Sequence, residues 1–294
     1  MAYDLSNQLV IGVASSALFD LSASDEVFRT QGEEPYRLYQ ETNIDNPLEP
    51  GVAFPFIRRL LSLNDLSDES GPLVEVIVLS KNDPDTGVRV MRSIQHHNLS
   101  ISRAVFMQGR SPYKFMPAFN MALFLSADEK DVAEAVRLGH PAGRVLDTSS
   151  EDDTGDDLRI AFDFDGVLAD DSSERVMQEK GLEAFHENEV SRVDEPHPNG
   201  LMVDLLAGIN RIQRREEEKR RVDASYRIRV HVALVTARNA PSHERALRSL
   251  KSWGVTVNDA FFLGGIEKAS VLEILKPHIF FDDQATHLTS ASKV

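Results

Sequence analysis

The stretch that decides the fold is Leu158–Leu168, which reads Leu-Arg-Ile-Ala-Phe-Asp-Phe-Asp-Gly-Val-Leu. It begins as a short apolar run, typical of a buried strand, and breaks into a loop at Asp163, Asp165 and Gly166. Residues at i and i+2 of a strand point the same way, so both carboxylates can face one site at the carboxyl end of the strand. Two carboxylates placed there repel each other unless a cation or a shared proton holds them. The stretch therefore predicts a site for a hard, oxygen-ligated metal such as Mg²⁺.

Three later segments repeat this pattern of an apolar strand that ends at polar side chains. The first reads His-Val-Ala-Leu-Val-Thr-Ala-Arg, the second Phe-Phe-Leu-Gly-Gly-Ile-Glu-Lys, and the third His-Ile-Phe-Phe-Asp-Asp. They occupy residues 231–238, 261–268 and 278–283, and their polar ends are Thr236, Lys268, Asp282 and Asp283. Ligands of α/β sheets gather outside the carboxyl ends of the strands, so we expect the four segments to converge on one site.

Each of these side chains also has an ordinary structural interpretation. A threonine at a strand end is usually structural, a lysine after two glycines often begins a solvated helix, and paired aspartates often cap a helix. The ordered set favours a shared site over these separate roles. A receiver-type phosphoaspartate domain uses the same residue types, but its phosphorylated aspartate ends a middle strand, and no isolated aspartate does so in this sequence.

The composition favours a soluble intracellular enzyme. The 294 residues are enough for one large domain or two modest ones, and the absence of cysteine excludes disulfides, thiolate metal sites and a cysteine nucleophile. A net charge of −15 disfavours a nucleic acid polymer as a partner. No apolar run reaches the ~18 residues of a membrane span, and the amino-terminus lacks the basic start of a signal peptide. We expect a cytoplasmic protein with no membrane partner, and the oligomeric state, including a homo-oligomer, stays open.

The chain divides at an acidic segment. Residues 147–157 read Asp-Thr-Ser-Ser-Glu-Asp-Asp-Thr-Gly-Asp-Asp, a polar stretch without periodicity that is typical of a solvated linker. It separates residues 1–146 from residues 158–294, which are two halves of similar length.

The two halves look related. When the chain is shifted by 156 residues, residues 80–110 fall on residues 236–266 without a gap, and six of the 31 aligned positions are identical. Asn98 falls on Gly254, and these residue types are the ones that most often end a helix in the left-handed conformation. We interpret the pattern as an ancient duplication. The identical pairs are Arg89 and Arg245, Arg92 and Arg248, Ser93 and Ser249, Ala104 and Ala260, Phe106 and Phe262, and Gly109 and Gly265.

The first half lacks the acids of the second. The aligned residues are Ala14 and Ser16 for Asp163 and Asp165, and Ser126 and Ala127 for Asp282 and Asp283. A hydroxyl remains at Ser80, and a lysine, Lys114, is displaced by two positions from the expected place. Without carboxylates this half cannot hold Mg²⁺ or form an acyl phosphate. We expect it to be structural, or to shape the substrate pocket of the other half.

The second half is predicted as a strand, an insertion at about residues 170–228, and then strand-helix-strand-helix-strand. The insertion has helical spacing at Met202, Leu205, Leu206, Ile209 and Ile212. A charged run, Arg214–Arg221, follows as a solvated helix face, with i,i+4 pairs such as Glu216 with Arg220 and Glu217 with Arg221. The helix after Thr236 should bury Ala246, Leu247, Leu250 and Trp253 on one face and stop at Gly254.

The order of acids, threonine, lysine and paired acids, each at a strand end, resembles the haloacid dehalogenase (HAD) superfamily of phosphatases. Several phrases narrow the resemblance to the cytosolic 5′-nucleotidase I family. They are Ala-Phe-Asp-Phe-Asp-Gly-Val-Leu-Ala-Asp-Asp-Ser-Ser-Glu, Leu-Val-Thr-Ala-Arg-Asn-Ala-Pro, Arg-Ser-Leu-Lys-Ser-Trp-Gly-Val and Lys-Pro-His-Ile-Phe-Phe-Asp-Asp-Gln, with Asn82–Gly87 and Gly109–Pro112 in the first half. The resemblance covers nearly the whole chain.

This resemblance implies an α/β fold, with a HAD-like Rossmannoid parallel sheet and a helical cap insertion, preceded by a degenerate, related half. It also implies Mg²⁺-dependent hydrolysis of nucleoside 5′-monophosphates, AMP especially, in the cytosol. The chain would then be a phosphoric monoester hydrolase of nucleotide metabolism.

The residues then suggest a mechanism. Asp163 would attack phosphorus to form an aspartyl phosphate, and Asp165 would act as acid and then base. Mg²⁺ would bind Asp163, the Asp165 backbone carbonyl and Asp282, while Asp283 would hold a metal-bound water or the lysine. Phosphate oxygens would be bound by Thr236, by nearby backbone N–H groups such as that of Ala237, and by Lys268.

Other functions stay open at this stage. The chain could hydrolyse another small phosphomonoester, such as a sugar phosphate, or it could be a nucleotide-binding regulator with low turnover. A purely structural protein is disfavoured, because one half keeps every acid while the other has lost them.

Overall fold

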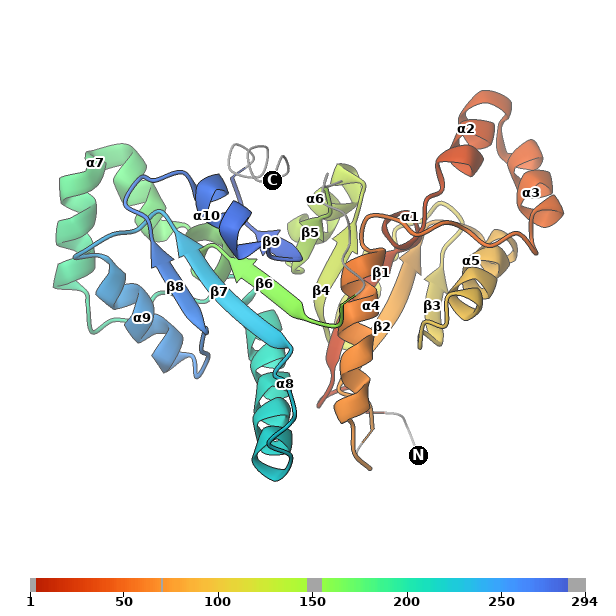
Figure 1. Ribbon diagram of the computed structural model, residues 1–294. Coiled ribbons are helices and arrows are strands. Elements are labelled where there is room, and N and C mark those ends of the chain that lie inside the picture. The colour runs from red at the N-terminus through yellow and green to blue at the C-terminus, as the bar shows by residue number, and fades with distance from the viewer. Residues whose placement is uncertain (1–3, 70, 147–154, 285–294) are drawn as a thin grey trace. The chain divides into compact units, whose positions relative to one another are not determined.

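The computed structural model describes residues 4–69, 71–146 and 155–284, and the chain forms two compact units, Met1–Asp147 and Thr148–Val294. Each unit is an α/β structure built on a parallel sheet (Figure 1). Most of the predicted acidic linker, residues 147–154, lies outside the described residues. Among the described residues, no helix is both long enough and apolar enough to cross a membrane.

The first unit has five parallel strands in the order β3-β2-β1-β4-β5. The strands are β1 (Leu9–Ala14), β2 (Val74–Ser80), β3 (Arg103–Phe106), β4 (Met121–Ser126) and β5 (Ala142–Arg144). The helices are α1 (Ser15–Leu18), α2 (Ser22–Gln31), α3 (Glu33–Thr42), α4 (Phe54–Ser62), α5 (Pro84–His96) and α6 (Glu129–Arg137), with 3₁₀ turns η1 (Leu63–Leu66) and η2 (Tyr113–Phe119). Every residue of β1 and β2 is buried, as expected for central strands covered on both faces.

The second unit has four parallel strands in the order β8-β7-β6-β9. The strands are β6 (Leu158–Phe162), β7 (Val230–Thr236), β8 (Asp259–Phe262) and β9 (Ile279–Phe281). The helices are α7 (Ser172–Ser191), α8 (Val203–Val222), α9 (His243–Ser252) and α10 (Lys268–Leu275), and a short helical loop, η3 (Phe164–Leu168), follows β6. The predicted α/β fold with parallel sheets is confirmed, and it is consistent with a HAD-like Rossmannoid arrangement.

The two units share the order of their first four strands. In each unit the first strand lies between the second and the last of the four, with the third outside the second. Asn98, two residues after the end of α5, has a φ of 55°, and Gly254, two residues after the end of α9, has a φ of 70°, so both left-handed stops predicted from the sequence are confirmed. The next amide closes each helix: Leu99 N–H donates to the Ile94 carbonyl, and Val255 N–H to the Leu250 carbonyl. We propose that the units arose by duplication.

The predicted insertion consists of two helices that occupy different positions relative to the sheet. The apolar residues predicted for α8 are buried, and α8 packs against β7 as a crossover helix covering the sheet. Helix α7 instead reaches the carboxyl ends of the strands, where Glu174 accepts a hydrogen bond from the side chain of Gln284. It is broken at Gly181, whose φ of 84° is left-handed. We therefore restrict the proposed cap to α7.

Three details of the helix predictions are wrong. Glu216 does not pair with Arg220, because it is fully buried and accepts hydrogen bonds from Tyr226 Oη and the backbone N–H groups of Arg229 and Val230, which anchors the start of β7. Glu217 pairs with Arg220, three residues along the helix, rather than with Arg221. Leu247 is 42% exposed and not part of the buried face of α9.

Candidate active site

The carboxyl ends of three strands of the second unit carry the predicted site. Phe162 lies in register with Leu234 on β7 and with Phe281 on β9. The residues that follow these strands therefore emerge side by side at one edge of the sheet. The backbone N–H of Asp163 donates to the Phe281 carbonyl at 2.8 Å, which holds the loop after β6 against the end of β9.

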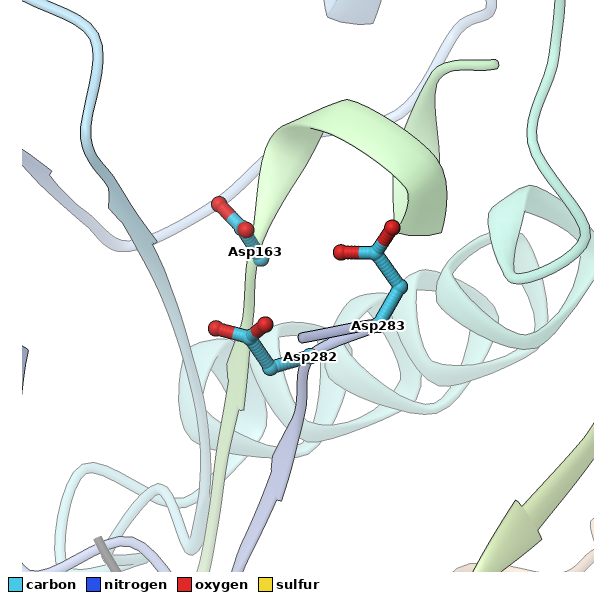
Figure 2. A group of neighbouring side chains, drawn as sticks. All are labelled: Asp163, Asp282 and Asp283. Atoms are coloured by element: carbon cyan, nitrogen blue, oxygen red, sulfur yellow. The ribbon is translucent and has the colours of Figure 1, made fainter. Parts of the chain in front are cut away.

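Three aspartates meet at this edge (Figure 2). Asp163, Asp282 and Asp283 each offer one carboxylate oxygen, and these oxygens lie within 4.8 Å of one another. Lys268, at the start of α10, donates to an oxygen of Asp163 and to one of Asp282, each at 2.6 Å. Among residues 4–69, 71–146 and 155–284, this is the only group of three or more acidic or imidazole side chains that lie close enough to hold a metal ion together.

The protonation of the cluster reflects its burial. Burial raises the pKa of Asp163 to about 7; the charge of Lys268 opposes this shift and the charge of Asp282 adds to it. Burial and the charge of Asp282 likewise raise the pKa of Asp283. In this cluster one ammonium group faces three carboxylates.

The cluster fits a divalent cation. Carboxylate oxygens are the hard donors that such a cation prefers, and two further positive charges would offset the burial and the charge of Asp282 that raise the pKa of Asp163 and Asp283. Gly166 makes the close approach of Asp283 possible, because a Cβ at this position would lie 2.2 Å from Asp283 Oδ2. Its φ of 74° is also left-handed, a conformation that glycine adopts without strain.

The side chain of Asp165 points to a different partner. Arg238, two residues beyond the end of β7, donates from Nε and Nη2 to the two carboxylate oxygens of Asp165, at 2.7 and 2.6 Å. Asp165 is therefore not one of the three clustered acids, and the predicted metal contact through its backbone carbonyl stays a prediction. Arg238 could not be identified from the sequence, since a single arginine after a strand carries no motif.

Arg238 is in turn bound to Glu189 on α7. Its Nη1 donates to Glu189 Oε2, and Arg245 Nη1 donates to Glu189 Oε1 at 2.9 Å. Burial would raise the pKa of Glu189, but the hydrogen bond with His197 and the charge of Arg238 outweigh it and hold the pKa far below its usual range. A fully buried carboxylate thus joins α7 to the residues after β7.

The remaining predicted residues lie at the same edge. Thr236 is the last residue of β7 and is buried, and its Oγ1 accepts a hydrogen bond from the Arg238 backbone N–H at 3.3 Å. Ala237, the next residue, is exposed. In the first unit, Ser80 ends β2 and its Oγ shares a hydrogen bond with Ser15 Oγ at 2.9 Å. The first unit has no carboxylates at the positions of Asp163 and Asp282.

The fold and the site define an α/β protein with a lysine-bearing acidic cluster at the carboxyl edge of a parallel sheet, an arrangement suited to a metal and a phosphate. The family model described as 5′-nucleotidase matches residues 1–294, so the chain belongs to the 5′-nucleotidase family. It is 32% identical over 294 residues to human cytosolic 5′-nucleotidase 1B, in an alignment that covers 98% of this chain and 48% of the relative. The chain thus spans about half the length of this curated relative. No solved structure matches the chain significantly.

Proposed function

We propose that this chain is a Mg²⁺-dependent 5′-nucleotidase that hydrolyses nucleoside 5′-monophosphates, with AMP favoured, to nucleoside and phosphate. The observation that carries the proposal is the contact of Lys268 with both Asp163 and Asp282 beside a third carboxylate. Family membership supports the reaction class. The relative is named a cytosolic 5′-nucleotidase, and we propose the cytosol as the location of this protein as well.

In the first step, Asp163 attacks the phosphorus atom. A bond forms between a carboxylate oxygen and phosphorus, the bond from phosphorus to the nucleoside 5′-oxygen breaks, and Asp165 donates a proton to that oxygen. The products of this step are the nucleoside and an aspartyl phosphate. The Asp163 carboxylate is held in place for this role, because its Oδ1 accepts from the Phe164 N–H at 2.7 Å and its Oδ2 accepts from Lys268 at 2.6 Å.

In the second step, water hydrolyses the aspartyl phosphate. Asp165, now ionised, takes a proton from the attacking water, a bond forms between water oxygen and phosphorus, and the bond to Asp163 breaks. The cycle returns both carboxyl groups to their starting states. Two carboxyl groups with different surroundings can divide these roles, and here one contacts Lys268 and the other contacts Arg238.

The other residues of the edge bind and neutralise the phosphate. Lys268 offsets negative charge on the phosphoryl group and on Asp163 as the transition state forms, and Thr236 with the Ala237 N–H binds phosphate oxygens. Asp163, Asp282 and the Asp165 carbonyl would hold Mg²⁺, with Asp283 orienting a metal-bound water. The ion would supply the positive charge that the three acids lack, and so let Asp163 react as the anion.

A phosphate-release assay tests the proposal. The purified chain is incubated with AMP and with a panel of other nucleotides and sugar phosphates, after EDTA treatment and after addition of Mg²⁺. We expect release from AMP that EDTA abolishes and Mg²⁺ restores, because without the cation the acids and the phosphate dianion repel one another. Full activity after rigorous chelation would contradict the metal-dependent mechanism. Preferred release from a sugar phosphate would contradict the substrate class and support the alternative phosphatase.

A further inference from the structure

One buried cation links the proposed acid to the proposed cap. The Arg238 side chain is 2% exposed, and its guanidinium binds both carboxylate oxygens of Asp165 and one oxygen of Glu189. Nη1 also donates to the Ser242 carbonyl at 3.3 Å. These hydrogen bonds of the guanidinium are all made to acceptors of the second unit.

Two aromatic rings hold the guanidinium in place. The Cζ atom of Arg238 lies 4.8 Å from the ring centroid of Phe164 and 5.2 Å from that of Phe185. Phe164 follows the proposed nucleophile and Phe185 is on α7, so the arginine lies between the loop after β6 and the cap helix. Such cation–π contacts fix the plane of the guanidinium as well as its position.

Part of this network of hydrogen bonds is repeated in the first unit. There, Arg89 donates from Nε to the Asn46 carbonyl and from Nη1 to Gln40 Oε1, as Arg245 does to the Glu195 carbonyl and to Glu189 Oε1. The Oγ of Ser93 accepts from the Leu48 N–H, as that of Ser249 does from the His197 N–H, both at 2.9 Å. The frame around α5 is therefore repeated around α9.

The two units differ at the residues that join this frame to Asp165. An offset of 149 residues relates Gln40 to Glu189 and Ser16 to Asp165, and an offset of 156 residues relates Asn82 to Arg238. Strand register supports these offsets, because Val13 lies opposite Val78 as Phe162 lies opposite Leu234. The unit that lacks the proposed catalytic acids thus also lacks the counterparts of Arg238 and Glu189, while it keeps Arg89, the counterpart of Arg245.

We propose that Arg238, fixed by Glu189, is a positioning residue that aims the carboxyl group of Asp165 at the nucleoside 5′-oxygen. This inference rests on the proposed function. A two-pronged guanidinium contact sets the plane of a carboxylate, and each oxygen keeps a second lone-pair direction for the leaving group or for water. Because Arg238 is also bound to Glu189 on α7, the orientation of the Asp165 carboxyl group depends on the position of α7. If α7 is displaced, Asp165 no longer points at the 5′-oxygen.

The test separates positioning of the acid from general support of the fold. Release of the leaving group, adenosine or p-nitrophenolate, is measured with enzyme in excess on two substrates, AMP and p-nitrophenyl phosphate, because the later hydrolysis of the aspartyl phosphate uses Asp165 with both. The 5′-oxygen of AMP needs a proton to leave, whereas p-nitrophenolate leaves without one. Since general acid catalysis is worth roughly 10²–10⁴-fold, we expect Arg238→Met to slow AMP at least ~10²-fold and p-nitrophenyl phosphate less than ~10-fold.

Two more variants sharpen the test. Arg238→Lys keeps the charge but not the two-pronged contact, so it should also slow AMP more than the aryl phosphate. The double change Glu189→Gln with Arg238→Asn copies the pair Gln40 and Asn82 that the first unit tolerates, so it covers the case in which Arg238→Met fails to fold. It should show the same selective loss on AMP.

Arg245→Met is the matched control. Arg245 is equally buried and binds the same glutamate, but it does not contact Asp165. We expect a lower melting temperature and equal effects on both substrates. Equal losses on both substrates in the Arg238 variants, or full recovery with Arg238→Lys, would contradict positioning while leaving the proposed function intact. No phosphate release from AMP by the unchanged protein would contradict both.

Discussion

At Asp163, two influences oppose the negative charge that the proposed nucleophile needs. Burial and the neighbouring Asp282 raise its pKa to about 7, and Lys268 alone among the side chains in contact with it supplies positive charge. A further cation beside Asp163 would oppose both influences and favour the charged carboxylate.

The first residue-scale prediction concerns this nucleophile. Asp163→Asn keeps the size of the side chain but removes the attacking oxygen anion and one metal donor. We expect turnover of AMP to fall by ~10³-fold or more, with the protein still folded. Steady-state phosphate release and circular dichroism check this expectation. Residual activity within tenfold of the unchanged protein would refute the assignment.

At the scale of elements, the strand ends could be predicted from the sequence, whereas the side-chain contacts between elements could not. Asp163, Thr236 and Asp282 could be placed because each follows an apolar run, and the edge of a parallel sheet brings such residues together. Glu189 and Arg238 could not, because the bond between them joins a helix to a loop 49 residues away and neither lies in a local motif.

Glu216 shows the same limit in a helix. Its charged neighbours suggested a solvated face, yet it is buried because β7 begins beside it with backbone N–H groups that need acceptors. Leu247 was predicted to be buried for the opposite reason: its helical spacing places it beside the buried face of α9, but none of the described elements covers it. Both errors come from tertiary contacts that one-dimensional periodicity does not contain.

The network around Glu189 gives a pH prediction at this scale. His197, Arg238 and Arg245 face its carboxylate, and its pKa is held far below the usual value near 4.5. A lowered folded-state pKa contributes stability above the unfolded-state pKa and loses it as pH falls, because the unfolded chain then takes up the proton first. We expect Glu189→Gln to lower the free energy of unfolding by about 3 kcal/mol at pH 7, and by progressively less from pH 5 to pH 3.

The protein supplies its own probe for this measurement. Trp253, the only tryptophan, lies in the second unit with its ring stacked 6.0 Å from Phe164, so its fluorescence reports urea unfolding of that unit. Glu187→Gln is the control, since Glu187 is exposed on the same helix and should change little at either pH. If the difference in the free energy of unfolding between the unchanged protein and Glu189→Gln stays constant from pH 7 to pH 3, the charge of Glu189 contributes nothing to stability.

At the scale of the whole molecule, the chain carries one arrangement of strands twice and one set of acids once. β2 ends at Ser80 as β7 ends at Thr236, and β4 ends at Ser126 where β9 is followed by Asp282. The order of strands alone therefore does not determine chemistry, since it depends on which side chains follow the strand ends. This contrast allows equivalent positions to be compared within one protein.

The last prediction uses these pairs. Lys268→Ala should slow turnover on the order of 10²-fold, since it removes a preorganised charge that contacts two of the acids, and Thr236→Ala should raise KM or lower kcat through lost phosphate contact. Ser80→Ala and Lys114→Ala should leave kcat within about twofold, because the first unit has no carboxylates at the positions equivalent to Asp163 and Asp282. Steady-state kinetics on AMP and melting temperatures, measured for all four variants, test these expectations. A collapse of turnover in Lys114→Ala, with binding and folding unchanged, would show that the first unit supplies a catalytic group and that its strand ends still take part in the reaction.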